Sequence, residues 1–98
     1  MRHERNMRFH LISTLLVFIT AYSLNVSKSD YLWLSIAITL VWVTELLNTA
    51  IEQLTNLAHP EFHPVAGRVK DLAAGAVLLA SLFGVAVAIA VFFPYIFS

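Results

Sequence analysis

From Leu72 to Phe97 the chain contains no charged residue, and this apolar stretch exceeds the roughly 20 helical residues that cross a bilayer core. Two further apolar stretches, residues 9–26 and 31–57, precede it. Only 12% of the 98 residues are charged and 59% are hydrophobic, whereas the surface of a water-soluble domain needs far more charge. Helices satisfy their own backbone groups in lipid. The sequence therefore predicts an all-α integral membrane protein, a single domain over residues 1–98 with three transmembrane helices.

Positive charge is concentrated at one end of this predicted bundle. Three arginines precede the first span, two basic residues separate the second span from the third, and the first turn holds a single lysine. In chain order these are Arg2, Arg5, Arg8, Lys28, Arg68 and Lys70. Because basic loops stay on the cytoplasmic side, we expect the N-terminus and the second loop there. A net charge of zero gives no reason to expect a nucleic-acid partner, and the absence of cysteine excludes disulfide and thiolate chemistry.

Two local patterns predict how the helices begin and pack. The turn "SKSD" precedes the second span, where Ser29 or Asp30 is expected to cap the helix. The third span has a small residue at every fourth position, a pattern that lets helix backbones approach closely in a membrane. The members of this stripe are Ala76, Ala80, Gly84 and Ala88.

A polar stripe interrupts the second span. Glu45, Asn48 and Glu52 are three and then four residues apart, so they share one face of a helix. At about 1.5 Å per residue, Glu45 lies roughly 21 Å and Glu52 roughly 32 Å from Tyr31 at the outer interface. In a core about 30 Å thick, Glu45 therefore lies in the inner third and Glu52 at the cytoplasmic boundary. A charge inside a span costs about 2.5–3.5 kcal/mol, which makes these carboxylates candidates for function.

The chemistry of these groups favours phosphoryl transfer. A carboxylate at the depth of Glu45 can take a proton from a lipid hydroxyl, and Glu52 can hold Mg²⁺ together with substrate phosphates. In "GRVKD", Lys70 is expected beside a helix N-terminus, where phosphate binds readily. Two other classes stay open: an oligomeric channel whose ion path is lined by the glutamates, and a structural subunit without activity. His10 is explained by its place at the interface.

The segments "ELLNTAIEQL" and "PEFHPVAGRVKDLAAGAVLL" resemble the signature of the prokaryotic diacylglycerol kinase and undecaprenol kinase family. The upstream "ERNMRFH" is similar to the segment before that family's first span, so the likeness covers nearly the whole chain. The resemblance implies a kinase of the bacterial inner membrane that transfers the ATP γ-phosphate to a lipid hydroxyl with Mg²⁺. It also implies a homotrimer with shared active sites on the cytoplasmic side, and an N-terminal surface helix that is here largely missing.

The resemblance also implies roles for individual residues. Glu45 is the expected general base, and Asn48 lies beside it at the lipid substrate. The nucleotide and its Mg²⁺ are expected at six residues, of which Glu4 and Glu52 are the metal ligands: Glu4, Glu52, Phe62, His63, Lys70 and Asp71. The chain departs from the family pattern at Asn56, where many relatives have Asp, and at Phe62, where some have Tyr.

The lipid substrate is expected to be undecaprenol. The segments "PEFHP" and "ERNMRFH" resemble the undecaprenol kinase branch, whereas "AGRVKD" is similar to the diacylglycerol branch. Diacylglycerol is therefore the alternative, and both lipids present a primary hydroxyl near the headgroup layer.

Overall fold

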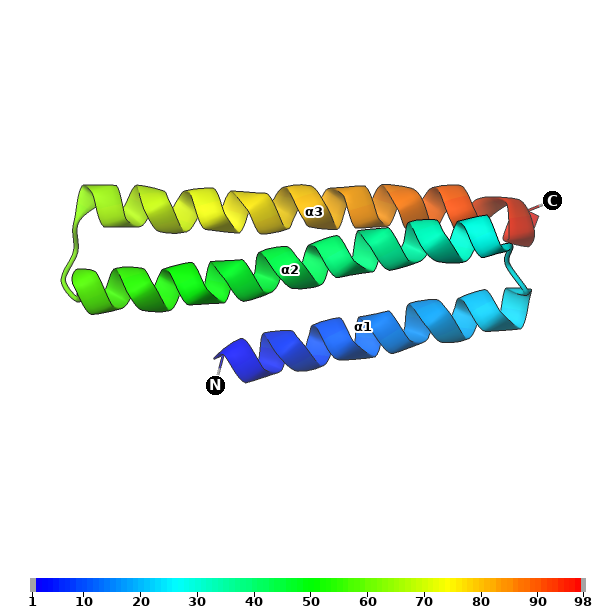
Figure 1. The fold of residues 1–98 in the computed structure, drawn as a ribbon, viewed down its shortest axis with the longest axis horizontal. Coiled ribbons are helices and arrows are strands. Elements are labelled where there is room, and N and C mark those ends of the chain that lie inside the picture. Colours follow the sequence, from blue (N-terminus) through cyan, green and yellow to red (C-terminus); the bar gives the residue numbers. More distant parts are fainter. Residues whose placement is uncertain (1, 98) are drawn as a thin grey trace.

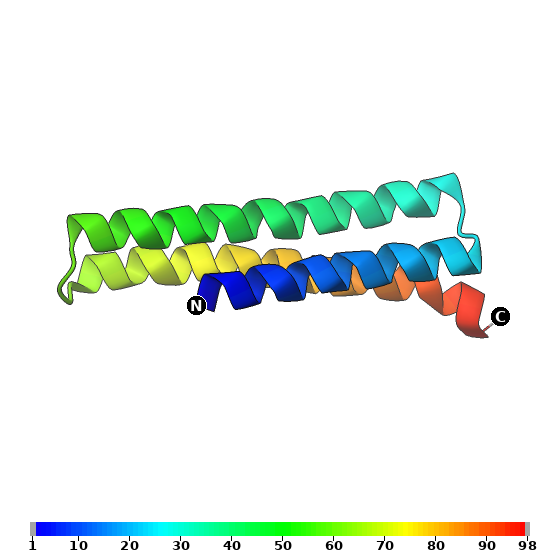
Figure 2. The same ribbon diagram turned by 90° about the horizontal axis from the view of Figure 1, so that it is seen from below.

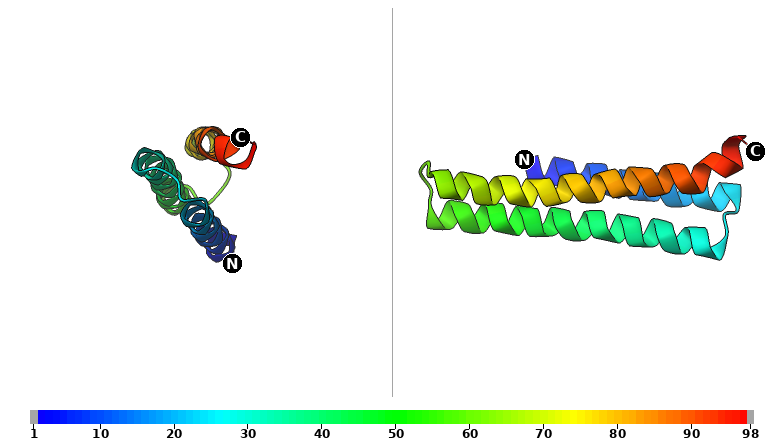
Figure 3. Two further views of the ribbon diagram at one scale, coloured as in Figure 1. Left: turned by 90° about the vertical axis from the view of Figure 1, so that its right-hand side faces the viewer. Right: turned by 90° about the horizontal axis from the view of Figure 1, so that it is seen from above.

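The computed structural model describes residues 2–97, with side chains from residue 6 onward, and it consists of three long helices. Helix α1 spans Arg2–Leu24, α2 spans Lys28–Ala58 and α3 spans Pro64–Phe97. Helices that follow one another in the chain run antiparallel. The three helices lie at the corners of a triangle when the bundle is viewed from its end (Figures 1 and 3). Residues 6–24 of α1 and the whole of α2 and α3 are long and apolar enough to cross a membrane. The all-α prediction with three such helices is confirmed.

Both α2 and α3 are longer than the bilayer core is thick. The 31 residues of α2 measure roughly 46 Å at about 1.5 Å per residue, against a core of about 30 Å. Helix α1 is shorter, and its N-terminus lies well short of the α2–α3 turn (Figures 1 and 2). The ends of α2 and α3 that meet at this turn therefore extend beyond α1 and form a two-helix arm.

A Schellman motif, the hydrogen-bonded turn that commonly ends a helix, terminates α1. Asn25 adopts a positive φ of 55°, which asparagine tolerates better than most residues. Its N–H donates to the carbonyl of Tyr22 at 3.1 Å, and the N–H of Val26 donates to the carbonyl of Ala21 at 3.2 Å. Val26 and Ala21 are both buried in the apolar core that α1, α2 and α3 form near this turn, so the turn is stabilised by packing as well as by hydrogen bonds.

Helix α2 begins earlier than the sequence analysis predicted. Ser27, not Ser29 or Asp30, is the N-cap, and its Oγ accepts from the N–H of Asp30 at 3.1 Å. Asp30 thus lies in the first turn, where a carboxylate is stabilised by the helix dipole. Tyr95 of α3 donates its hydroxyl to Asp30 Oδ2 at 2.7 Å and accepts from the N–H of Ser27 at 3.2 Å. These bonds tie the end of α3 to the α1–α2 turn.

The buried face of α3 follows a seven-residue repeat and differs from the predicted stripe of small residues. Ala76 is exposed, although Ala80, Gly84 and Ala88 are buried or half-buried. Positions that alternate four and three residues apart are all buried or half-buried: Ala66, Lys70, Ala73, Val77, Ala80, Gly84, Val87 and Val91. Alternating steps of this kind keep one face of a helix against its neighbour along the whole length. We call this row the α3 seam.

Candidate functional site

Helix α2 has a matching row of inward positions. They also alternate four and three residues apart, and all are buried or half-buried: Leu34, Ile38, Val41, Glu45, Asn48, Glu52 and Thr55. We call this row the α2 seam. The half nearer the α1–α2 turn, which we call the outer half, is apolar, whereas the half nearer the α2–α3 turn, which we call the polar half, contains Glu45, Asn48 and Glu52. The prediction that these three residues share one face of a helix is confirmed, and that face is buried or half-buried.

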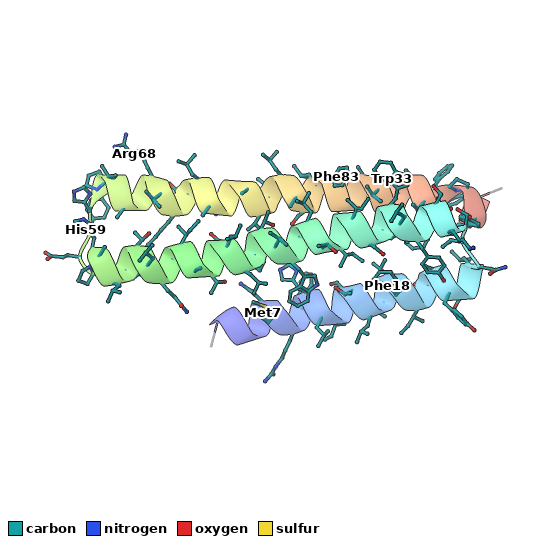
Figure 4. The ribbon with its side chains drawn as sticks, in the orientation of Figure 1. Met7, Phe18, Trp33, His59, Arg68 and Phe83 are labelled. Atoms are coloured by element: carbon teal, nitrogen blue, oxygen red, sulfur yellow. The ribbon has the colours of Figure 1, made fainter. Side chains whose placement is uncertain are left out.

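Lys70 belongs to the α3 seam, close to the end of the same interface that lies at the α2–α3 turn. The side chain of Val41 packs against Gly84, and this register brings Lys70 opposite Thr55, one turn beyond Glu52. Arg68 instead lies on the outer surface and points away from the bundle, near the end marked by His59 (Figure 4). Asp71 is exposed beside the seam. The two basic residues of the loop motif thus have different environments, and Lys70 is the one that faces the interior.

The helix start that was expected next to Lys70 lies further upstream. Helix α3 begins at Pro64, so Lys70 lies in its second turn, beyond the free N–H groups of the helix end. His63 is the residue at that end: its carbonyl accepts from Gly67 at 3.0 Å, and its Nδ1 accepts from the N–H of Val65 at 3.1 Å. Proline suits the first helical position because it has no N–H to satisfy.

Phe62 and His63, the two residues whose rings were predicted to contact the nucleotide, lie at the α2–α3 turn. Because the Nδ1 of His63 is a hydrogen-bond acceptor, the neutral imidazole carries its proton on Nε2. The ring of His59 lies 4.7 Å from that of His63, centroid to centroid. The side chain of Phe62 is almost fully exposed. The turn lies beyond Glu52 along the bundle, at the end of α2.

Glu45 is the single buried charged residue among the side chains that the structure describes, with 6% of its surface exposed. Its Oε2 lies 3.5 Å from Nε2 of His10 on α1. From the sequence, His10 was expected at the interface, and its contact with Glu45 was not expected. The contact follows from the register of the two helices: because α1 and α2 run antiparallel, steps back along α1 match steps forward along α2. Thr14 contacts Trp42, so His10, four residues before Thr14, lies opposite the part of α2 that contains Glu45.

Asn48 links the two carboxylates of the α2 seam. Its Nδ2 donates to Glu52 Oε1 at 3.5 Å, while its buried Oδ1 has no hydrogen-bond partner. A buried amide oxygen without a donor is costly, which indicates that a ligand supplies one or that a cation takes its place. Oxygen atoms of carboxylates and amides are the ligands that Mg²⁺ prefers. The carboxylate of Glu52 therefore fits a magnesium ion, and Oδ1 of Asn48 stays available to accept a hydrogen bond from a substrate.

Within residues 6–97, three or more potential metal ligands of the His, Cys, Asp or Glu type do not converge at any point. Mg²⁺ does not require such a cluster, because it is commonly held by one or two carboxylates that share it with substrate phosphates. Glu4, the second predicted metal ligand, lies in α1, and its side chain lies outside the described residues.

A groove of about 250 Å³ opens between the three helices on the outer side of Glu45. Most of the side chains that line it are apolar. Its polar lining residues include His10, Ser13, Thr14 and Ser81. The polar residues of the site thus lie at the boundary between an apolar groove and the two-helix arm.

The family model for prokaryotic diacylglycerol kinase matches residues 1–92 of the chain. The chain belongs to the prokaryotic diacylglycerol kinase family. An undecaprenol kinase from Bacillus subtilis (strain 168) is 33% identical over 93 residues, which are 95% of this chain and 76% of that protein. A diacylglycerol kinase from Synechocystis is 35% identical over 96 residues, 97% of this chain and 55% of that protein. One from Escherichia coli (strain K12) is 32% identical over 83 residues, 85% and 68% respectively.

These relatives agree on the chemistry and differ in the lipid. All three are named as lipid kinases, so lipid phosphorylation is the activity of the prokaryotic diacylglycerol kinase family. The chain spans about three-quarters of the B. subtilis protein and about half of the Synechocystis protein. The identities to undecaprenol kinase and to the diacylglycerol kinases are nearly equal, so they do not separate the two lipids.

Proposed function

We propose that the chain transfers the γ-phosphoryl group of ATP to the primary hydroxyl of a membrane lipid, undecaprenol, at the cytoplasmic end of the α2–α3 interface. The observation that carries this proposal is a buried carboxylate, Glu45, on the same seam as an amide oxygen without a partner, Asn48 Oδ1. Family membership favours this hypothesis over an ion path or a structural subunit. Diacylglycerol is the alternative acceptor.

Glu45 is the proposed general base. Its carboxylate accepts the proton of the lipid hydroxyl as the hydroxyl oxygen forms a bond to the γ-phosphorus. The bond between the γ-phosphorus and the oxygen that bridges to the β-phosphate breaks, and ADP leaves with the electron pair. Asn48 supports the same step. Its Oδ1 has no hydrogen-bond partner, lies one helical turn from Glu45, and can accept a hydrogen bond from the substrate. The depth of Glu45 suits a hydroxyl held just below the headgroup layer.

The proposed ligands of Mg²⁺ are Glu52 and Glu4. The contact of His10 with Glu45 supports this pair. In the same antiparallel register, Glu4 lies six residues before His10 on α1, and Glu52 lies seven residues after Glu45 on α2. When bound, Mg²⁺ neutralises charge on the phosphates. Glu52 keeps its carboxylate oriented through the amide of Asn48, at the mouth of the two-helix arm.

The nucleotide is proposed to lie along the two-helix arm. Lys70 faces the interface there and supplies a positive charge to the transferring phosphoryl group. Asp71, next to it at the surface, supports this end of the site. His63 offers a ring N–H on Nε2, and exposed Phe62 offers a ring face to the base of the nucleotide.

Assembly and location belong to the same proposal. We propose a homotrimer in which a neighbouring subunit completes each active site, because α1 leaves the two-helix arm with walls from only two helices (Figures 1 and 2). We also propose the bacterial inner membrane as its location, with the active site on the cytoplasmic side. Arg68 and Lys70 at the α2–α3 end, against Lys28 alone at the other, support that orientation.

The test is Mg²⁺-dependent transfer of the ATP γ-phosphate in detergent–lipid mixed micelles, with undecaprenol and diacylglycerol offered separately. Transfer to undecaprenol that exceeds transfer to diacylglycerol is the expected result. Preference for diacylglycerol would replace the lipid and keep the kinase. No transfer to either lipid by the folded chain would refute the proposed function. Cross-linking in the same micelles tests the trimer.

A further inference from the structure

Among the side chains that the structure describes, Glu45 has one titratable neighbour on the helices packed against it, His10. On α3 the register set by Val41 and Gly84 brings Ala80 opposite Glu45, and the helix carries no charge beyond Asp71. On α2 the next carboxylate belongs to Glu52, seven residues away. On α1 the side chain that reaches Glu45 is that of His10, whose Nε2 lies 3.5 Å from Oε2.

The imidazole of His10 is held in place by its surroundings. It packs edge-on against Phe9, with ring centroids 5.8 Å apart, and tilted against Trp42 at 5.9 Å. The indole N–H of Trp42 donates to Oγ1 of Thr14 at 2.9 Å, and the hydroxyl of Thr14 donates to the carbonyl of His10 at 2.7 Å. Through Thr14, Trp42 is thereby linked to the backbone of His10, and the indole of Trp42 also contacts the imidazole of His10. The ring of His10 is half-buried and approaches Glu45 from one side only.

We infer that His10 is a positioning residue for Glu45. Its Nε2 faces Oε2 of the carboxylate and holds that oxygen toward α1, which leaves Oε1 directed to the lipid hydroxyl. The inference rests on the proposed function, in which Glu45 is the base. His10 itself touches neither lipid nor phosphate in this assignment.

Orientation of the base is worth a large rate factor. A carboxylate that rotates freely presents its oxygen to the hydroxyl for only part of the time, and small misplacements of reacting groups lower rates steeply. Among the described side chains, the only other polar contact between α1 and α2 is the hydrogen bond from Trp42 to Thr14. The arrangement therefore serves to set the position of α1 and the orientation of Glu45 together.

The experiment compares three single variants of the full chain in mixed micelles: His10→Leu, His10→Gln and, as a matched control at an exposed histidine of the α2–α3 turn, His59→Gln. His10→Leu should lower kcat by up to about 10²-fold with the KM for Mg–ATP unchanged. His10→Gln should recover most of that loss, because the amide nitrogen of glutamine reaches the position of the imidazole Nε2. His59→Gln should behave as the unaltered chain.

A second measurement does not depend on activity. In ¹⁵N spectra of the histidine side chains, Glu45→Gln should shift the His10 signals and leave those of His59 in place. Unchanged His10 signals would overturn the inference, as would equal losses of kcat in His10→Leu and His10→Gln, or a change confined to KM. If the unaltered chain transfers no phosphate, the proposed function fails, and the spectra still decide whether His10 and Glu45 interact.

Discussion

The two halves of the α2–α3 interface share one packing pattern and hold opposite contents. In the outer half, the interface between α2 and α3 (Figure 1) is filled by buried apolar residues such as Leu34, Ala37, Val87 and Val91. In the polar half, near the α2–α3 turn, the same alternation of four and three residues brings Glu45, Asn48, Glu52 and Lys70 inward. The helices do not change, so the difference is carried by side chains alone. A continuous seam lets one end serve as the anchor and the other as the site.

The difference also separates stability from activity. The outer half has apolar packing, a Schellman turn and the Tyr95–Asp30 bond, all of which stabilise the bundle. The polar half has a buried carboxylate and an amide oxygen without a partner, both of which cost free energy. Functional sites commonly break local rules of stability in this way. Substitutions in the two halves should therefore affect different measurements.

The largest effect is expected for Glu45→Gln. Removal of the proposed base should lower phosphoryl transfer by roughly 10²–10⁴-fold. The thermal unfolding midpoint should stay the same or rise, because a neutral amide is less costly to bury than a carboxylate. The measurement is transfer of the γ-phosphate in mixed micelles, with circular dichroism for unfolding. Retained activity would remove Glu45 from the mechanism and end the distinction between the halves.

Lys70→Ala is expected to have the next largest effect. Loss of the inward positive charge should lower transfer by roughly 10²–10³-fold, since one preorganised group that stabilises developing charge is worth about that much. Arg68→Ala is the matched control, because Arg68 has the same charge, lies two residues away and points outward (Figure 4). Similar losses in both variants would show that net charge of the loop, rather than the seam, matters.

Leu34→Ala tests the anchor. Leu34 is among the most buried side chains of the outer half, so its truncation should destabilise the bundle by roughly 1–2 kcal/mol through lost packing. Transfer per folded molecule should not change. Leu32→Ala, at an exposed position nearby, should leave the unfolding midpoint within error. Lost activity with unchanged stability in Leu34→Ala would contradict the separation of the two halves.

The smallest effect is expected for Tyr95→Phe. This substitution removes the hydroxyl that donates to Asp30 and accepts from Ser27, at a cost of about 1 kcal/mol. Hydrogen exchange at the α1–α2 turn should become faster, while phosphoryl transfer stays constant. Tyr22→Phe is the control, because the side chain of Tyr22 is exposed. Faster exchange in both variants would show that the clamp contributes nothing specific.

The number of helices and the polar face could be predicted from the sequence because both depend on local patterns. Apolar length indicates a span, and spacing of three and four indicates a shared face, so Glu45, Asn48 and Glu52 were grouped correctly. Helix ends were predicted less well. Ser27 caps α2 because the Schellman turn ends α1 at Leu24, and α3 begins at Pro64 because His63 caps it.

Contacts between helices were largely beyond sequence reasoning. His10 and Glu45 are far apart in the chain, and their contact depends on the register of a hairpin whose turn was predicted a few residues too late. The buried stripe of α3 depends on its partner, so a pattern of small residues alone marked Ala76 as inward when it is exposed. Binding of Mg²⁺, ATP and lipid, and the trimer, stay predictions.

The continuous seam has a consequence for how the chain tolerates changes in length. One residue inserted between Glu45 and Glu52 would rotate everything beyond it by about 100° and turn Glu52 away from α3. An insertion of seven residues would restore the face but move Glu52 about 10 Å further from Glu45. The segment between the two glutamates should therefore admit substitutions at its lipid-facing positions, such as Leu46 and Leu47, and no insertions or deletions.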